Sequence, residues 1–183
     1  MPANSPPIEL DAVVGLFFDP VSELAQFDTT PAADLPTLAN HLLNHDHHMT
    51  VTVEQHHGCP VNVKVLAEFD SGSHYCRKIL LTRSTDDAVV QFGIVRLDMS
   101  VLPDEVRLQI REKQIPLGRI LISHDVMRAV KLNSLYRITT GSELAGHFGQ
   151  PEKSICFGRT AWMYCNGKPA IELLEIVPVP ATG

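Results

Sequence analysis

The residue with the clearest chemical potential is Arg77, which interrupts the apolar face of a strand-like run from residue 74 to residue 81. Side chains in a strand alternate between two faces, so Arg77 shares its face with Tyr75, Ile79 and Leu81. A guanidinium cannot lose its proton in a protein, and leaving one unpaired inside a core is costly. Arg77 is therefore predicted to meet a carboxylate of a ligand, to pair with a carboxylate of the protein, or to reach water at an exposed strand end.

A second charged residue, Glu175, occupies the same kind of position in the last strand-like run, at residues 168–177. It shares a face with Leu173, whereas Glu172 points to the other face, which is also apolar. A carboxylate in such a setting is either paired or has a raised pKa, and a raised pKa suits a general acid near neutral pH. Glu175 is thus a candidate general acid, while an internal salt bridge between Arg77 and Glu175 is the structural alternative.

The elements that position these residues follow from alternation, turn signals and helix starts. Strands are expected at residues 61–68, 74–81, 88–97, 132–140, 155–165 and 168–177, and helices near residues 35–43, 47–57 and 103–114. Short, turn-rich links join the first three strands, and Asn166-Gly167 marks a hairpin between the last two, so these neighbours are antiparallel. The predicted fold class is α+β, with a single antiparallel sheet of about six strands and flanking and inserted helices.

Length, charge and cysteine usage narrow the class of function. The chain has 183 residues, 44% of them hydrophobic, which suits one globular domain. A net charge of -6 disfavours nucleic acid and anionic membranes, and no run reaches the roughly 18 apolar residues of a membrane span. The cysteines include no CxxC pair and fit reduced thiols. These features predict a cytoplasmic protein that binds neither nucleic acid nor a membrane. A monomer is expected because no strand edge or apolar stripe indicates a protein partner, and the resemblance described below implies a small-molecule substrate.

Two further segments bear on the organisation of the chain. Residues 1–36 are rich in proline and are predicted to form a loosely attached, partly ordered leader, so that the functional domain spans residues 37–183. Beyond the leader, His41 and His45 would share a helix face, a spacing compatible with a metal site. No HExxH-like pattern accompanies them, so a solvated polar surface is favoured and no metal site is predicted.

From about Met49 to Pro178 the sequence resembles the chorismate pyruvate-lyase family. That family cleaves chorismate to 4-hydroxybenzoate and pyruvate, and it shares its fold with the effector-binding domains of some bacterial repressors. The similar pieces are Met49-Thr50 with the following helix and Gly58, the run Tyr75–Leu81, Ile115-Pro116-Leu117-Gly118-Arg119, Phe157-Gly158-Arg159, and Asn166-Gly167-Lys168-Pro169 leading to Glu175. Together they cover about 70% of the chain and leave out the leader.

The resemblance implies roles for the arginines of the sheet. Arg77 falls where the family places the arginine that clamps a substrate carboxylate, a bidentate task suited to a planar guanidinium. Some members carry a second arginine directly after the glycine that corresponds to Gly93, where this chain has Ile94. Arg96, two residues further on the same face, is the expected substitute, and Arg159 is a further substrate-binding candidate.

The other expected site residues also follow from the resemblance. Met49 and Leu117 fall where the family packs apolar residues on the substrate ring, and Thr50 and Gly118 stand beside them as substrate-binding candidates. Glu175 falls where the family has a carboxylate near the hydroxyl end of the aromatic product, although a one-residue shift in this region keeps Glu172 as the rival. The implied chemistry needs no cofactor, because loss of a ring proton and expulsion of enolpyruvate yield an aromatic ring.

The sequence thus predicts a cofactor-independent carbon–oxygen lyase that converts chorismate to 4-hydroxybenzoate and pyruvate. An alternative is a non-catalytic binder of a small aromatic carboxylate on the same fold, although the acidic, proline-rich leader does not resemble a DNA-binding segment. A third reading is a lyase that acts on a relative of chorismate.

Overall fold

A computed structural model describes residues 5–179 of the chain, apart from the side chains of residues 127 and 128. The α-helices are α1 (Leu10–Val14), α2 (Thr37–Leu43), α3 (Met49–His57), α4 (Asp104–Glu112), α5 (Leu117–Ser123) and α6 (Ser142–Phe148). Short 3-10 helices occupy η1 (Val21–Glu23), η2 (Ala32–Asp34) and η3 (Met99–Val101). The strands are β1 (Ala25–Thr29), β2 (Val61–Ser71), β3 (His74–Arg83), β4 (Val89–Asp98), β5 (Met127–Thr140), β6 (Ile155–Cys165) and β7 (Lys168–Val177).

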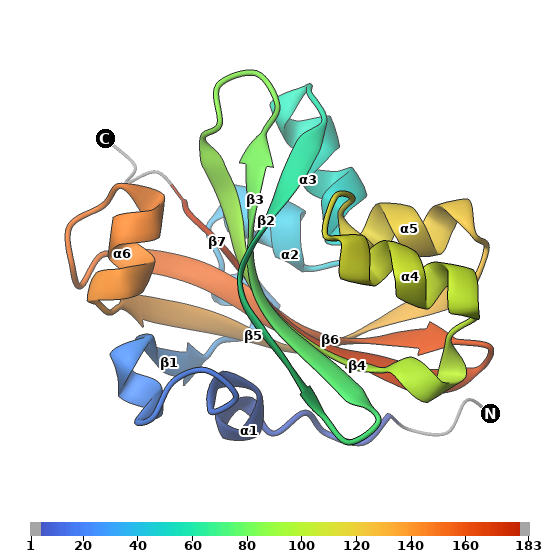
Figure 1. The fold of residues 1–183 in the computed structure, drawn as a ribbon. Helices are drawn as coiled ribbons and strands as arrows, with labels where there is room; N and C mark the ends of the chain where they lie inside the picture. The colour runs from blue at the N-terminus through green and yellow to red at the C-terminus, as the bar shows by residue number, and fades with distance from the viewer. Residues whose placement is uncertain (1–4, 180–183) are drawn as a thin grey trace.

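The strands form one seven-stranded antiparallel sheet in the order β1-β5-β6-β7-β4-β3-β2 (Figure 1). The predicted α+β class with a single antiparallel sheet is confirmed, and β1 is the strand that the sequence did not indicate. Tight turns join β2 to β3 and β6 to β7, and the second of these is the predicted Asn166-Gly167 hairpin, with both residues at positive φ. The last strand, β7, lies between β6 and β4, so the two halves of the sheet meet at the strand that carries Glu175.

Helices cover the two faces of the sheet unequally (Figure 1). One face carries α2, α3, α4 and α5, whose apolar residues pack on Tyr75, Ile79 and Leu173 and their neighbours. The other face carries α1 and α6 on a separate cluster that includes Leu80 and Leu174. Because neighbouring residues such as Leu173 and Leu174 fall in different clusters, the strand alternation that the sequence predicted is present in β3 and β7.

The leader is packed onto the sheet rather than loosely attached. Strand β1 pairs with β5 from Ala25 opposite Thr140 to Thr29 opposite Tyr136, and Val14 of α1 is fully buried. The leader's prolines do not prevent this packing, because several of them lie directly before helical turns, where proline is tolerated. The division of the chain at residue 36 stays a prediction.

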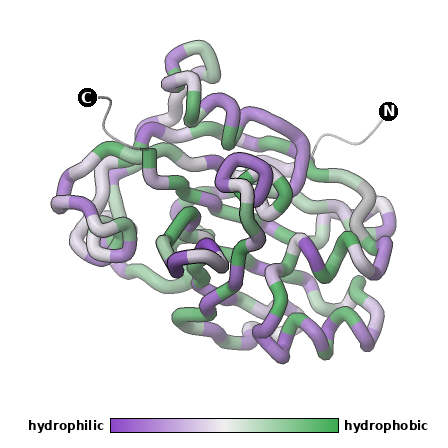
Figure 2. The backbone as a smooth tube through the Cα atoms, turned by 90° about the horizontal axis from the view of Figure 1, so that it is seen from above, coloured by the Kyte–Doolittle hydropathy of each residue, from purple (hydrophilic) through white to green (hydrophobic). Residues whose placement is uncertain are grey.

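Within residues 5–179 no helix is long and apolar enough to cross a membrane. Figure 2 shows hydrophilic and hydrophobic residues interspersed along the chain.

Candidate ligand-binding site

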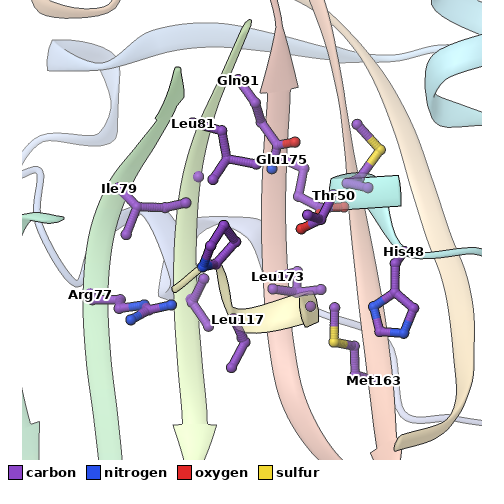
Figure 3. A pocket seen from close by; sticks show the side chains of 15 residues that line it. His48, Thr50, Arg77, Ile79, Leu81, Gln91, Leu117, Met163, Leu173 and Glu175 are labelled. Atoms are coloured by element: carbon purple, nitrogen blue, oxygen red, sulfur yellow. The ribbon is translucent and has the colours of Figure 1, made fainter. Parts of the chain in front are cut away.

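A narrow cavity with about 30 Å³ of space lies between the sheet and the first turns of α3 and α5 (Figure 3). Its floor comes from β3, β4, β6 and β7, and its roof comes from the segments that lead into the two helices. The residues that line it are His48, Met49, Thr50, Arg77, Ile79, Leu81, Gln91, Gly93, Val95, Pro116, Leu117, Gly118, Met163, Leu173 and Glu175. The cavity therefore gathers Met49, Thr50, Arg77, Leu117, Gly118 and Glu175, six residues that the sequence singled out.

Arg77 reaches this cavity because of its position in β3. It lies opposite Val95 of β4 and on the same face as Tyr75 and Ile79, so its side chain enters the helix-covered side of the sheet. The side chain is completely buried, which excludes the exposed strand end as an explanation of this arginine.

The Arg77 guanidinium is only weakly bonded within the protein. Nη1 donates to the Ile110 carbonyl at 3.4 Å, at the limit of a hydrogen bond, while Nε and Nη2 have no partner among the described residues. Burial lowers the pKa of Arg77, and the neighbouring Tyr75 and Glu68 partly offset this effect. An arginine nevertheless keeps its proton, so the cavity contains a positive charge with two donors that lack an acceptor.

Glu175 pairs with Arg159 and not with Arg77. Arg159 Nε donates to Glu175 Oε2 at 2.7 Å, and both side chains are buried, with 0% and 6% of their surface exposed. The remaining Arg159 donors bind the loop between α2 and α3: Nη1 donates to the His45 carbonyl at 2.7 Å and Nη2 to the His47 carbonyl at 3.0 Å. The internal Arg77–Glu175 salt bridge is therefore absent. Arg159, predicted to bind substrate, is not among the residues that line the cavity.

Arg96 and Glu172 lie on the opposite face of the sheet. They are directly opposite each other in β4 and β7, and Arg96 Nη1 lies 3.2 Å from Glu172 Oε1 in a partly exposed ion pair. Arg96 therefore does not substitute for a second arginine in the cavity, and Glu172 is not the rival of Glu175. The physical reason is the two-residue period of a strand, which puts residues at odd and even positions on different faces.

Gly118 allows the first turn of α5 to lie close to the segment that begins α3. A Cβ atom at this position would be 2.9 Å from Thr50 Oγ1 and 3.1 Å from His48 Nδ1, both too close for an ordinary contact. The absence of a side chain at residue 118 thus brings the two walls of the cavity together.

The Gly118→Ala variant is expected to lose about 1–3 kcal/mol of unfolding free energy, because the added methyl group overpacks this contact. Urea denaturation followed by circular dichroism would measure the loss. The matched control is Gly146→Ala in α6, where an added Cβ meets nothing within 4 Å. That control should be neutral or stabilising by up to about 1 kcal/mol, because alanine is the better helix former. Equal effects in the two variants would contradict the assigned role of Gly118.

Two polar residues of the cavity were not predicted. Gln91 is buried on the cavity side of β4, and its Oε1 has no partner among the described residues. Gln91 interrupts an apolar strand face in the way that Arg77 and Glu175 do, so the same alternation pattern could have predicted it. His48 precedes α3 and also has an unpartnered atom, Nδ1, but one histidine within a histidine-rich segment carries no comparable signal.

Two histidines of the α2–α3 loop are withdrawn from solvent: His45 is half-buried and His48 is buried. Burial and the nearby Arg159 charge lower the pKa of His45 and of His48 to about 4, so both rings are neutral at pH 7. His45 bonds the Leu42 carbonyl through Nε2 at 2.7 Å. Among the described residues no group of three or more His, Cys, Asp or Glu side chains is arranged to hold a metal ion.

Comparison with known proteins relates this chain to others through its fold. No protein-family model and no curated protein sequence matches it. Among solved structures it is similar to PhnF from Mycobacterium smegmatis, with a TM-score of 0.55 and 13% identity over 72% of this chain and 63% of the PhnF chain. The separate effector domain of PhnF gives a TM-score of 0.55 and 15% identity over 71% of this chain and 86% of that domain.

A third similar structure is the ligand-binding domain of a Bordetella bronchiseptica protein assigned to the GntR family of transcriptional regulators. It has a TM-score of 0.52 and 12% identity, and the match covers 66% of this chain and 86% of that domain. At such identities the likeness establishes the fold alone. This fold is the one that the sequence resemblance implied through the effector-binding domains of bacterial repressors.

These similarities correct the predicted lyase. The similar structures are an effector domain and the ligand-binding domain of a regulator, and they give no support to chorismate, 4-hydroxybenzoate or pyruvate as substrate and products. In the site, Glu175, the expected proton carrier, is held by Arg159 in a buried salt bridge.

Proposed function

We propose that this chain is a non-catalytic binding domain for a small organic acid, and that Arg77 anchors the carboxylate of that acid. The observation that carries the proposal is the buried Arg77 guanidinium, which faces the cavity with Nε and Nη2 unpartnered. These two donors lie on the same side of a planar group, and a carboxylate can accept from both of them at once.

The charges of the surrounding side chains favour a ligand with one negative charge. Arg159 compensates the carboxylate of Glu175 at 2.7 Å, so the unbalanced charge next to the cavity is that of Arg77. A single carboxylate would balance it, whereas a second anionic group would meet Glu175. The proposed ligand is therefore a monocarboxylic acid.

The rest of the cavity surface suits a flat apolar body with one polar substituent. Ile79, Leu117, Met163 and Leu173 supply apolar walls, and these are the surfaces on which an aromatic ring packs well. At some distance from Arg77 along the sheet, Gln91 offers an amide that can bond a hydroxyl group. The chemistry of this lining suits a small aromatic carboxylate with a hydroxyl substituent, whose body needs more room than the present cavity of about 30 Å³ offers.

The fold gives the proposal a biological setting. This chain shares its fold with an effector domain and with a regulator's ligand-binding domain, and we propose that it likewise serves as an effector-binding domain. The expected monomeric state, the absence of nucleic-acid contacts and the cytoplasmic location remain predictions.

Isothermal titration calorimetry with 4-hydroxybenzoate tests the proposal, with 4-hydroxybenzamide as a neutral control of the same shape. The acid is expected to bind with saturation and to raise the melting temperature, and the amide is expected to do neither, because Arg77 would remain without an anion. Chorismate incubated with the protein should stay intact. Equal binding of acid and amide, or formation of 4-hydroxybenzoate from chorismate above the uncatalysed rate, would contradict the proposal.

A further inference from the structure

We infer that the His48 side chain is a gate between the Arg77 cavity and an outer pocket, and that the bound acid extends past it into that pocket. This inference rests on the proposed function and adds the length of the ligand and the chemistry of its far end. The outer pocket has about 450 Å³ of space and is lined by residues that include Asp46, His47, His48, Gln55 and Val130. His48 is the residue that lines both spaces.

The inner cavity must connect to the outer pocket if an aromatic acid binds at Arg77, because the inner cavity alone is too small for it. One water molecule needs about 10–15 Å³ of such space, so the inner cavity, with about 30 Å³, has room for a carboxylate group but not for the body of an aromatic acid. In Figure 3 His48 lies on the side of the pocket away from Arg77. A ligand anchored at Arg77 can therefore gain room by displacing the His48 ring.

Hydrogen bonds hold the His48 backbone, whereas Nδ1 of its buried ring makes none. The His48 carbonyl accepts from Thr52 N at 3.2 Å and from Thr52 Oγ1 at 3.1 Å, and Arg159 fixes the preceding carbonyl of His47. In contrast, His48 Nδ1 has no hydrogen-bond partner among the described residues. Rotation of the ring thus breaks no bond at Nδ1, and since the ring is neutral at pH 7 it moves no charge.

The lining of the outer pocket defines the far end of the ligand. Asp46 and Gln55 are exposed at its rim, and Asp46 Oδ1 already accepts from the Leu132 backbone N–H at 2.9 Å. Because the Asp46 carboxylate repels a second anionic group, the far end of the acid carries no negative charge, and a hydroxyl or an amide suits this polar rim. The ligand is thus a monocarboxylic acid longer than the inner cavity, with a polar uncharged end.

The experiment compares a short and a long acid on the full chain, with acetate as the acid that fits the inner cavity and 4-hydroxybenzoate as the acid that must pass His48. NMR titrations give both dissociation constants for the wild type, for His48→Ala, and for His56→Ala as the matched control. His56 is an exposed histidine of α3 that lines a different pocket. We expect His48→Ala to lower the dissociation constant of 4-hydroxybenzoate about tenfold. Without the ring the gate is always open, so every protein molecule is competent to bind the acid.

The dissociation constant of acetate should change by less than about twofold in His48→Ala. In His56→Ala the dissociation constants of both acids should stay unchanged. A second variant, His48→Ser, removes the ring and supplies a good N-cap for α3, so it keeps the test valid if the alanine variant folds poorly. If both acids bind and the removal of His48 leaves their affinity ratio unchanged, the gate is overturned while the proposed function stands. If neither acid binds to any of these folded proteins, the proposed function is overturned together with the gate.

Discussion

The Arg159→Met variant is expected to lose about 3–5 kcal/mol of unfolding free energy, which is the largest effect on stability that we expect from a single substitution in this site. Methionine has a similar length but leaves Glu175, only 4% exposed, as an unpaired buried carboxylate. It also removes the donors for the carbonyls of His45 and His47, which hold the α2–α3 loop on the sheet. Urea denaturation followed by circular dichroism would give the loss, and the melting temperature should fall by roughly 10 °C.

The matched control for this prediction is Arg96→Met. Arg96 also pairs with a glutamate of β7 from a neighbouring strand, but 36% of its side-chain surface is exposed. Water screens such a pair, so the control should change the stability by no more than about 1 kcal/mol. An Arg159→Met variant that is as stable as this control would show that the buried pair and the loop contacts do not hold the fold together.

The Arg77→Met variant is expected to have the opposite effect on stability and the largest effect on binding. It replaces a buried charge whose Nε and Nη2 are unpartnered by an apolar side chain, so the unfolding free energy should rise by about 1–3 kcal/mol. The same change removes the proposed carboxylate anchor. The affinity for 4-hydroxybenzoate should therefore fall at least about 100-fold, because loss of one partner of a buried charge pair costs about 3 kcal/mol.

Calorimetric titration and urea denaturation of the same Arg77→Met sample would measure both effects. Arg77→Lys serves as the comparison: it keeps the positive charge but lacks the planar pair of donors, so the acid should bind with an intermediate affinity. If Arg77→Met were destabilised as strongly as Arg159→Met, Arg77 would be a structural residue. The proposed anchor would then be wrong.

The pairing of Arg159 with Glu175 shows why some contacts could not be predicted from the sequence. At the turn, Cys165 lies opposite Lys168, and this register continued along the hairpin would place Leu174 opposite Arg159. An irregularity between Met163 and Tyr164 shifts the register by one residue and brings Glu175 opposite Arg159 instead. A shift of one residue exchanges the faces of the partner strand. No residue type in the hairpin predicts this register shift.

The sequence by itself determined the features that depend on local periodicity. The alternation of β3 and β7 placed Arg77 and Glu175 on the helix-covered face, Asn166-Gly167 fixed a hairpin, and the turn-rich links fixed an antiparallel sheet, because each of these follows from neighbours in the chain. The same alternation could have placed Gln91 on this face as well. It places Arg96 and Glu172 on the other face.

Only the tertiary structure decided how these charged residues are used. Arg77 and Arg159 are alike in sequence as strand arginines, yet Arg159 is saturated by Glu175 and the loop carbonyls while Arg77 keeps free donors toward a cavity. This difference arises from the insertion of β7 between β6 and β4 and from the approach of α3 and α5 over the sheet, contacts between segments far apart in the chain. Partner choice in a buried site depends on such long-range packing, which local sequence patterns do not encode.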